Sequence, residues 1–340
     1  MSSILCIGNA GIDLIAPVGA TWPTRAGAWQ VVEDGLEVKV GGCGYDTAIG
    51  IAKLGVASKL IAGVGSGGHG QLVRDELERQ GVVLPARCTH PTQATPLELL
   101  VADEGGRPSA MHFVGASKHV DAKLLRDLHG DGLFDDCSAI HLSGVGLLPG
   151  LERQDFAQAL LDILAHAPCL ELSLDVSLHE HRSRDVWQRV LQPLLGTGCV
   201  SVFSPNYDEA CQIHGLPRDA TIAERWAKDF FDFLQSRYDG LAKDFVLIVR
   251  DGAHGSVAVD AGGREVRMRA EPVEPVDLTS AGEAWWAGFL VGRHRQRERR
   301  EFDRSAGALV PALRFAHAVA ARAVQVRGSS AWDFDDLVED

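Results

Sequence analysis

The residues best placed to do chemistry lie within residues 277–290, where a run of small residues leads directly into an apolar segment. Ser280, Ala281, Gly282 and Glu283 are expected in the first turn of a helix, where backbone N–H groups lack intrahelical partners. These amides and the helix dipole favour an anion. Glu283 adds a carboxylate, although an acidic side chain there often serves only as a partner of the dipole. A catalytic role for Glu283 therefore depends on what the rest of the chain places beside it.

Two segments near the amino terminus also carry polar residues and glycines at the ends of predicted elements. Residues 3–8 are typical of a buried parallel strand, and Asp13 follows its carboxyl end, where open α/β sheets place ligand groups. Asp13 could equally cap a turn. Gly41 and Gly42 allow a ligand to approach the backbone, and a helical pattern begins just after Asp46.

Two later predicted strands are followed by polar residues. Residues 200–203 lead into Asn206 and Glu209, whose spacing matches a helix N-cap with an acidic third position but also suits a ligand site. Residues 245–249 are typical of a central parallel strand. Arg250 after them would supply a fixed positive charge suited to a triphosphate.

Composition excludes several classes of protein. The 340 residues are 46% hydrophobic, enough for a sizeable core, and the formal net charge is −13, which argues against binding to nucleic acid or an anionic membrane. Scattered cysteines without a C-x-x-C pair argue against disulfides or zinc. Because we find neither a signal segment nor a long apolar run, we expect a cytoplasmic protein. The basic run at residues 292–301 is expected to be a solvated helix face.

Strands alternate with helices along the whole length, which predicts an α/β fold with a doubly wound, mostly parallel sheet. We expect one domain spanning residues 1–340. Residues 14–40 lose the helical period, and residues 93–116 contain alternating stretches around Gly105 and Gly106, a hairpin pattern. Both segments are expected to form short strands.

In order and spacing, these segments resemble the ribokinase-like (PfkB-type) carbohydrate kinases over almost the whole chain. The second signature of that family reads Asp-Thr-Thr-Gly-Ala-Gly-Asp, followed by Ala-Phe and a buried Ala-Gly-Phe helix. The matching residues here are Asp277, Thr279, Ala281, Gly282, Ala284, Ala287, Gly288, Phe289 and Leu290. Ser280 replaces the first Gly of the family's anion hole, and Glu283 replaces its catalytic Asp.

The resemblance implies ATP-dependent phosphorylation of a hydroxymethyl group on a sugar or nucleoside-like substrate. Glu283 would deprotonate the hydroxyl, and the amides of Ala281 and Gly282 would hold the charge of the group in transfer. Replacing Asp by Glu moves the carboxylate by roughly 1 Å, which can cost about 100-fold in rate. Ser280 could crowd the phosphoryl group or donate another hydrogen bond. The alternative is an impaired or inactive homologue that binds nucleotide, sugar or a partner.

For the substrate, the resemblance implies contacts from Asp13, Gly41, Gly42 and Asp46. The family's first signature has Gly-Gly, a few residues and then Asn-x-Ala, and Asp46 stands in place of that Asn. An ionised Asp can only accept hydrogen bonds, so the change would suit a different hydroxyl pattern or an amino-bearing substrate.

The resemblance also implies a nucleotide site with Mg²⁺. The residues expected to contact the nucleotide are Asn206, Arg250, Gly252, Gly255 and His317. Glu209 would reach Mg²⁺ through water, and Asp277 matches a position whose backbone helps bind a monovalent cation such as K⁺ in many relatives.

Residues 14–40 and 93–116 would form a small β-sheet lid over the substrate. Lid strands in this family often pair between subunits, so a homodimer through the lid is expected by analogy. The expected partners are therefore a small-molecule substrate and a second copy of the chain, with no nucleic acid and no membrane.

Overall fold

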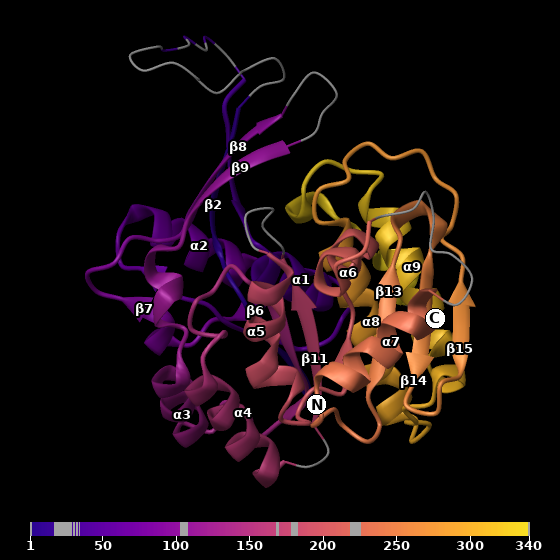
Figure 1. The fold of residues 1–340 in the computed structure, drawn as a ribbon. Helices are drawn as coiled ribbons and strands as arrows, with labels where there is room; N and C mark the ends of the chain where they lie inside the picture. Colours follow the sequence, from indigo (N-terminus) through magenta and orange to yellow (C-terminus); the bar gives the residue numbers. More distant parts are fainter. Residues whose placement is uncertain are drawn as a thin grey trace.

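The computed structural model describes residues 2–16, 29, 31, 33, 35–102, 108–167, 170–177, 183–217 and 226–338. Within these residues the main layer is a nine-stranded sheet in the order β15-β14-β13-β12-β11-β10-β1-β4-β6 (Figure 1). Its strands are β1 (Ser3–Ile7), β4 (Ser58–Ile61), β6 (Val82–Val83), β10 (Cys137–Val145), β11 (Glu171–Val176), β12 (Val202–Phe203), β13 (Val246–Arg250), β14 (Ser256–Asp260) and β15 (Glu265–Met268). Within this sheet of described residues, only the pairs β13–β14 and β14–β15 are antiparallel, which confirms the predicted mostly parallel α/β sheet.

Helices cover both faces of this sheet. On one face lie α3 (Ala122–Gly130), α4 (Gln154–His166), α5 (Arg184–Leu195), α6 (Tyr207–His214) and α7 (Trp226–Arg237). On the other lie α1 (Cys43–Lys53), α2 (Gly68–Arg79), α8 (Ala281–Glu298) and α9 (Val310–Ala323). Successive strand residues point to opposite faces, so Leu5 and Ile7 of β1 join the first core and Ile4 and Cys6 the second. The sheet is therefore buried on both sides, as parallel sheets are.

A second, smaller sheet in the order β3-β2-β8-β9 projects from the body next to α2 (Figure 1). Its strands are β2 (Gly11–Ala16), β3 (Glu37–Gly41), β8 (Leu97–Ala102) and β9 (Pro108–Phe113). We call it the small sheet. Strand β2 pairs antiparallel with β3 and parallel with β8, while β8 and β9 pair antiparallel. The expected strands in residues 14–40 and 93–116 are thus confirmed where the chain is described; residues 17–28, 30, 32, 34 and 103–107 lie outside the described residues. The role of the small sheet as a lid, and residues 1–340 as one domain, stay predictions.

Short elements complete the chain. They are β5 (Val64–Gly65), β7 (Thr89–His90), η1 (Ala86–Cys88), η2 (Gly115–His119), η3 (Gly252–His254), η4 (Ala306–Leu309), η5 (Ser329–Ala331) and α10 (Asp335–Val338). Among the residues described, we find no helix with both the length and the apolar character needed to cross a membrane.

The basic run at residues 292–301 is not simply a solvated helix face, so that prediction is wrong in part. Arg293 is 2% exposed and its Nη2 lies 3.0 Å from Oε2 of Glu171, itself 1% exposed. Arg293 also donates to the carbonyl oxygen of Asp303 at 2.8 Å. A buried arginine needs such partners, and Glu171 on the neighbouring sheet supplies them. Arg299 and Arg300 at the helix end are exposed, as predicted.

Candidate active site

Helix α8 begins at Ala281, where the sequence predicts a helix start. Ser280 precedes it with a φ of 60°, a left-handed conformation that favours glycine. The backbone therefore keeps a conformation suited to Gly although the residue is Ser. The N–H of Ala281 donates a long hydrogen bond of 3.3 Å to the carbonyl of Leu278. Within the described residues, Gly282 N–H has no backbone acceptor, so Gly282 offers the more open amide of the two.

The side chain of Ser280 is directed at Asp46 in the first turn of α1. The Ser280 hydroxyl donates to Oδ2 of Asp46 at 2.6 Å, and the hydroxyl of Ser329 donates to Oδ1. Asp46 is buried, and burial raises its pKa to about 7, against the opposing effect of these two hydroxyl bonds. The Ser280 hydroxyl is therefore already engaged with the protein.

Glu283 lies partly buried in the first turn of α8. Burial raises its pKa to about 7, helped by the negative charges of Asp46 and Asp175 and opposed by Arg250. Near neutral pH such a carboxyl group can accept a proton from a hydroxyl, which is the requirement for a general base.

Asp13 lies close enough to these carboxylates to affect them. Its charge raises the pKa of Asp46, while its own pKa is raised to about 7 by burial and by Glu98 and lowered by Lys39. The negative charge of Glu283 also raises the pKa of Glu209. Electrostatic effects thus link residues 13, 46, 209 and 283, and their place in one site and their roles stay predictions.

Gly41 and Gly42 have a packing reason to be glycine. A Cβ on Gly41 would lie 2.1 Å from Oδ2 of Asp13, and a Cβ on Gly42 would lie 2.8 Å from the carbonyl oxygen of Asn9. Gly42 also has a φ of 117°, which other residues rarely adopt. The two glycines therefore make room for Asp13 and for the chain leaving β1. Contact with a substrate stays a prediction.

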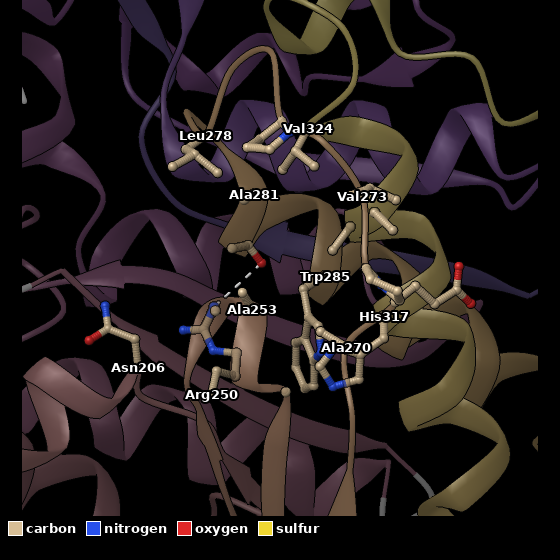
Figure 2. A pocket seen from close by; sticks show the side chains of 18 of the residues that line it. Asn206, Arg250, Ala253, Ala270, Val273, Leu278, Ala281, Trp285, His317 and Val324 are labelled. Atoms are coloured by element: carbon tan, nitrogen blue, oxygen red, sulfur yellow. Dashed lines mark hydrogen bonds between the residues drawn. The ribbon is translucent and has the colours of Figure 1, made fainter. Parts of the chain in front are cut away.

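Arg250 ends β13 and forms an ion pair with Asp175 at the end of β11. Nη2 of Arg250 lies 2.6 Å from Oδ1 of Asp175, and their side chains are only 11% and 6% exposed. Arg250 also donates to the carbonyl of Ser204 at 2.9 Å and reaches that of Gly282 at 3.5 Å (Figure 2). Asp175 therefore balances the fixed positive charge expected of Arg250, and a contact from Arg250 to a triphosphate stays a prediction. Among the described residues, the buried Nε of Arg250 has no partner.

A cavity of about 670 Å³ opens beside this arginine (Figure 2). Its lining includes every residue expected to contact the nucleotide: Asn206, Arg250, Gly252, Gly255 and His317. Ala281, Gly282 and Trp285 of α8 form part of the same wall. The size suits a small-molecule ligand. His317 bonds Ser256 Oγ through Nε2 at 2.8 Å, and burial lowers its pKa to about 4, so it is neutral at pH 7.

Asn206 and Glu209 form the helix cap that their spacing also allowed. Oδ1 of Asn206 accepts from Glu209 N–H at 2.9 Å, and Oε2 of Glu209 accepts from Asn206 N–H at 2.8 Å. In the described part of the chain, no group of three or more His, Cys, Asp or Glu side chains could hold a metal by itself. A contact from Glu209 to Mg²⁺ through water stays a prediction.

Asp277 ties the loop before α8 to the carboxyl-terminal segment. Its Oδ1 accepts from Thr279 N–H at 2.9 Å, and its Oδ2 accepts from Gly328 N–H at 3.2 Å. The carboxylate is thus used for holding two loops together, while the backbone role toward a monovalent cation stays a prediction.

The sequence predictions missed several residues of this region. Ser329 contacts Asp46 from a segment near the carboxyl end that has no recognisable pattern. Glu98 and Lys39 flank Asp13 on neighbouring strands. Only the register of the small sheet reveals that these residues are neighbours. Alternation in residues 95–101 was the available signal, because a charged residue within an apolar strand is unusual.

Gly282, with its open amide, lines the cavity, and Glu283 follows it in the same turn of α8. The model of the pfkB family of carbohydrate kinases matches residues 1–335, and the chain belongs to this family.

Individual proteins agree with this assignment. The fructokinase of Rhizobium leguminosarum bv. trifolii is 24% identical over 295 residues, 85% of this chain and 78% of that protein. A ribokinase structure from Giardia lamblia matches with a TM-score of 0.83 at 18% identity, over 99% of this chain and 98% of its own. The ribokinase of Arabidopsis thaliana, solved with ribose and ATP, matches with a TM-score of 0.73 at 18% identity, over 99% and 98%. The structural matches establish the ribokinase-like fold.

Proposed function

We propose that this protein transfers the γ-phosphoryl group of ATP to the hydroxymethyl group of a sugar or nucleoside-like substrate. The observation that carries the proposal is the position of Glu283, next to Gly282 of the cavity wall and in the first turn of α8, whose preceding residue Ser280 bonds Asp46. The family supplies the reaction class, and the Arabidopsis ribokinase that shares the fold was solved with a sugar and ATP.

The proposed reaction starts with the substrate hydroxyl beside Glu283. Glu283 accepts the hydroxyl proton, the hydroxyl oxygen forms a bond to the γ-phosphorus, and the bond from that phosphorus to the bridging oxygen of ADP breaks. The negative charge in transfer is stabilised by the open Gly282 amide and by Arg250, whose Nη1 lies near the Gly282 carbonyl. Because Ser280 bonds Asp46, its hydroxyl does not crowd this position.

ATP fits the cavity by size and by chemistry. Neutral His317 and the Trp285 ring offer apolar surface for a base, and Arg250 lies near the phosphate end. When bound, Mg²⁺ would neutralise phosphate charge. Glu209 would hold it through water, since one of its oxygens already accepts an amide N–H. Binding of K⁺ beside Asp277, a cytoplasmic location and a homodimer through the small sheet belong to the same proposal.

The test is incubation of the purified protein with Mg-ATP and a panel of sugars, nucleosides and amino sugars. We expect ADP and a phosphorylated product, and a loss of at least about 100-fold in kcat for Glu283→Gln. Glu78→Gln, an equal charge change at an exposed position on α2, serves as the control. Nucleotide or sugar binding measured by calorimetry without any turnover would instead identify a non-catalytic member of the family.

A further inference from the structure

A row of charged side chains crosses the small sheet. The strand register places Lys39 of β3 opposite Asp13 of β2, Asp13 opposite Glu98 of β8, and Glu98 opposite His112 of β9. Residues directly opposite one another on neighbouring strands share a face of the sheet. These four side chains therefore form a continuous polar row, which we call the charged row.

Asp13 of the charged row lies beside Gly41, at the turn that leads into α1 and to Asp46, since a Cβ on Gly41 would lie 2.1 Å from Oδ2 of Asp13. Ile12, Leu14 and Val40 alternate with the row and pack on the other face, against the core that includes Tyr45 of α1. The body of the protein on the α2 side thus contacts the apolar face of the small sheet.

Electrostatic effects agree with this orientation of the charged row. Asp13 lies close enough to Asp46 to raise its pKa, and Asp46 in turn raises that of Glu283.

Asp13 and Glu98 are like charges placed directly opposite each other, an arrangement that destabilises a sheet unless something compensates. The compensation available within the described residues is small. Lys39 is shared with Glu37, whose Oε2 lies 2.5 Å from its Nζ. Nδ1 of His112 donates to Oε2 of Glu98 at 3.2 Å, and the buried Nε2 of His112 has no partner in the described part of the chain.

Asp46 increases the negative charge of this region. The family's first signature has a neutral Asn there, and the largest influences on the Asp46 carboxyl after burial are two hydroxyls and two other acids, Asp13 and Asp277. None of these brings a positive charge. A substrate that carries a phosphate or carboxylate would be repelled by this surface, whereas a cation would be attracted.

We propose that the substrate carries an amino group, and that Asp13 and Glu98 of the small sheet bind it as an ammonium ion. This inference rests on the proposed function, whose site it shares. An ammonium group donates three hydrogen bonds, which the ionised carboxylates of Asp13 and Glu98 can receive, and its positive charge favours the ionised form of Asp13. The substrate class is then an amino sugar or a similar aminated polyol, and Glu98 is a specificity-determining residue.

Matched pairs of substrates test the proposal. D-Glucosamine and D-glucose, D-galactosamine and D-galactose, and 1-amino-1-deoxy-D-fructose and D-fructose differ by one amine in place of one hydroxyl. We measure kcat/KM with Mg-ATP, and Kd by calorimetry, for every sugar at pH 7. In at least one pair we expect the amino sugar to be preferred by about 10- to 100-fold.

Variants then locate the preference. Glu98→Gln is expected to reduce the preference for the amino sugar by about tenfold, whereas Glu78→Gln on the exposed face of α2 is expected to keep it. Thermal unfolding of both variants verifies that they are folded. A preference unchanged in Glu98→Gln overturns the assignment of Glu98, because a charged contact cannot be lost without effect.

The outcomes separate the inference from the proposed function. Turnover of neutral sugars with no preference for an amine overturns the inference and leaves the kinase function standing. Selective binding of amino sugars without turnover supports the inference and contradicts phosphoryl transfer. Absence of both binding and turnover across all pairs contradicts both.

Discussion

Ser280 Oγ lies 2.6 Å from Asp46 Oδ2, so the hydroxyl at the start of the candidate site contacts a buried carboxylate from a distant segment of the chain. One residue begins α8 and the other lies in the first turn of α1, and 234 positions separate them in the sequence. The Asp46 carboxylate accepts the hydrogen bond of the Ser280 hydroxyl, so we expect the effects of changing the two residues to depend on each other.

The free energy of unfolding should depend on which residue replaces Ser280. Ser280→Ala removes the hydrogen bond to a buried carboxylate and keeps a β-carbon at a positive φ, so we expect a loss of about 1.5 kcal/mol in the free energy of unfolding. Ser280→Gly also loses the bond but relieves the strained backbone, and should be about 1 kcal/mol more stable than Ser280→Ala. Urea unfolding at pH 8, where Asp46 is ionised, measures both. In an Asp46→Asn background the cost of Ser280→Ala should shrink, and an undiminished cost would contradict the pairing.

Activity should depend on pH through Glu283. Its pKa is raised to about 7, and a general base must be deprotonated, so kcat/KM should rise as the pH increases through about 7. Asp46→Asn removes a negative charge that raises this pKa, so the rise should move to lower pH, by on the order of 1 pH unit. Profiles from pH 5 to 9 measure the shift, with the exposed Asp239→Asn as control. A profile that is identical in Asp46→Asn and the wild type would argue against Glu283 as the base.

The Arg250–Asp175 pair should matter for stability as well as for nucleotide binding. Arg250→Met leaves the buried Asp175 without its cation, at a cost of about 3–5 kcal/mol. Burial already raises the pKa of Asp175, and loss of Arg250 raises it further, so the folded variant binds a proton that the unfolded chain does not. Its stability should therefore increase as the pH falls from 8 to 6. Denaturant unfolding at both values checks the direction, and Arg250→Met with Asp175→Asn should recover part of the loss.

Arg293 should differ sharply from the arginines at the end of its helix. Arg293→Met exposes no new surface but leaves Glu171 buried without its nearest cation, so we expect a loss of about 3–5 kcal/mol. Arg304 lies 3.5 Å from the same carboxylate and should moderate the effect. The exposed Arg300→Met should change the free energy of unfolding by less than about 0.5 kcal/mol. Similar small effects for both variants, by urea unfolding, would show that the buried pair contributes little.

Sequence patterns predicted the main strands well because buried parallel strands are short, continuous apolar runs. Residues 245–249 correspond to β13, which covers Val246–Arg250. Helix starts were less accurate. Helix α1 begins at Cys43, several residues before its apolar periodicity becomes visible, because glycine and polar residues fill the first turn.

Candidate site residues could be chosen from the sequence because backbone chemistry is local. Small residues before an apolar helix predict open amides, and a carboxylate three residues later belongs to the same turn, whatever the rest of the fold. Which side chains pair with one another could not be predicted in this way. Arg250 was expected to supply a fixed positive charge, and its ion pair with Asp175 depends on β13 and β11 lying on either side of β12.

The sequence alone therefore determined the α/β class, the helix start at residue 281 and the set of carboxylates that could act there. Those properties depend on neighbouring residues along the chain and on hydrophobic periodicity. Only the tertiary structure decided which charges meet, that Ser280 is bound to Asp46, and that Asp13 and Glu98 are adjacent. The physical reason is that Coulomb interactions and burial depend on distance in space, which strand order and register set and which sequence separation does not reveal.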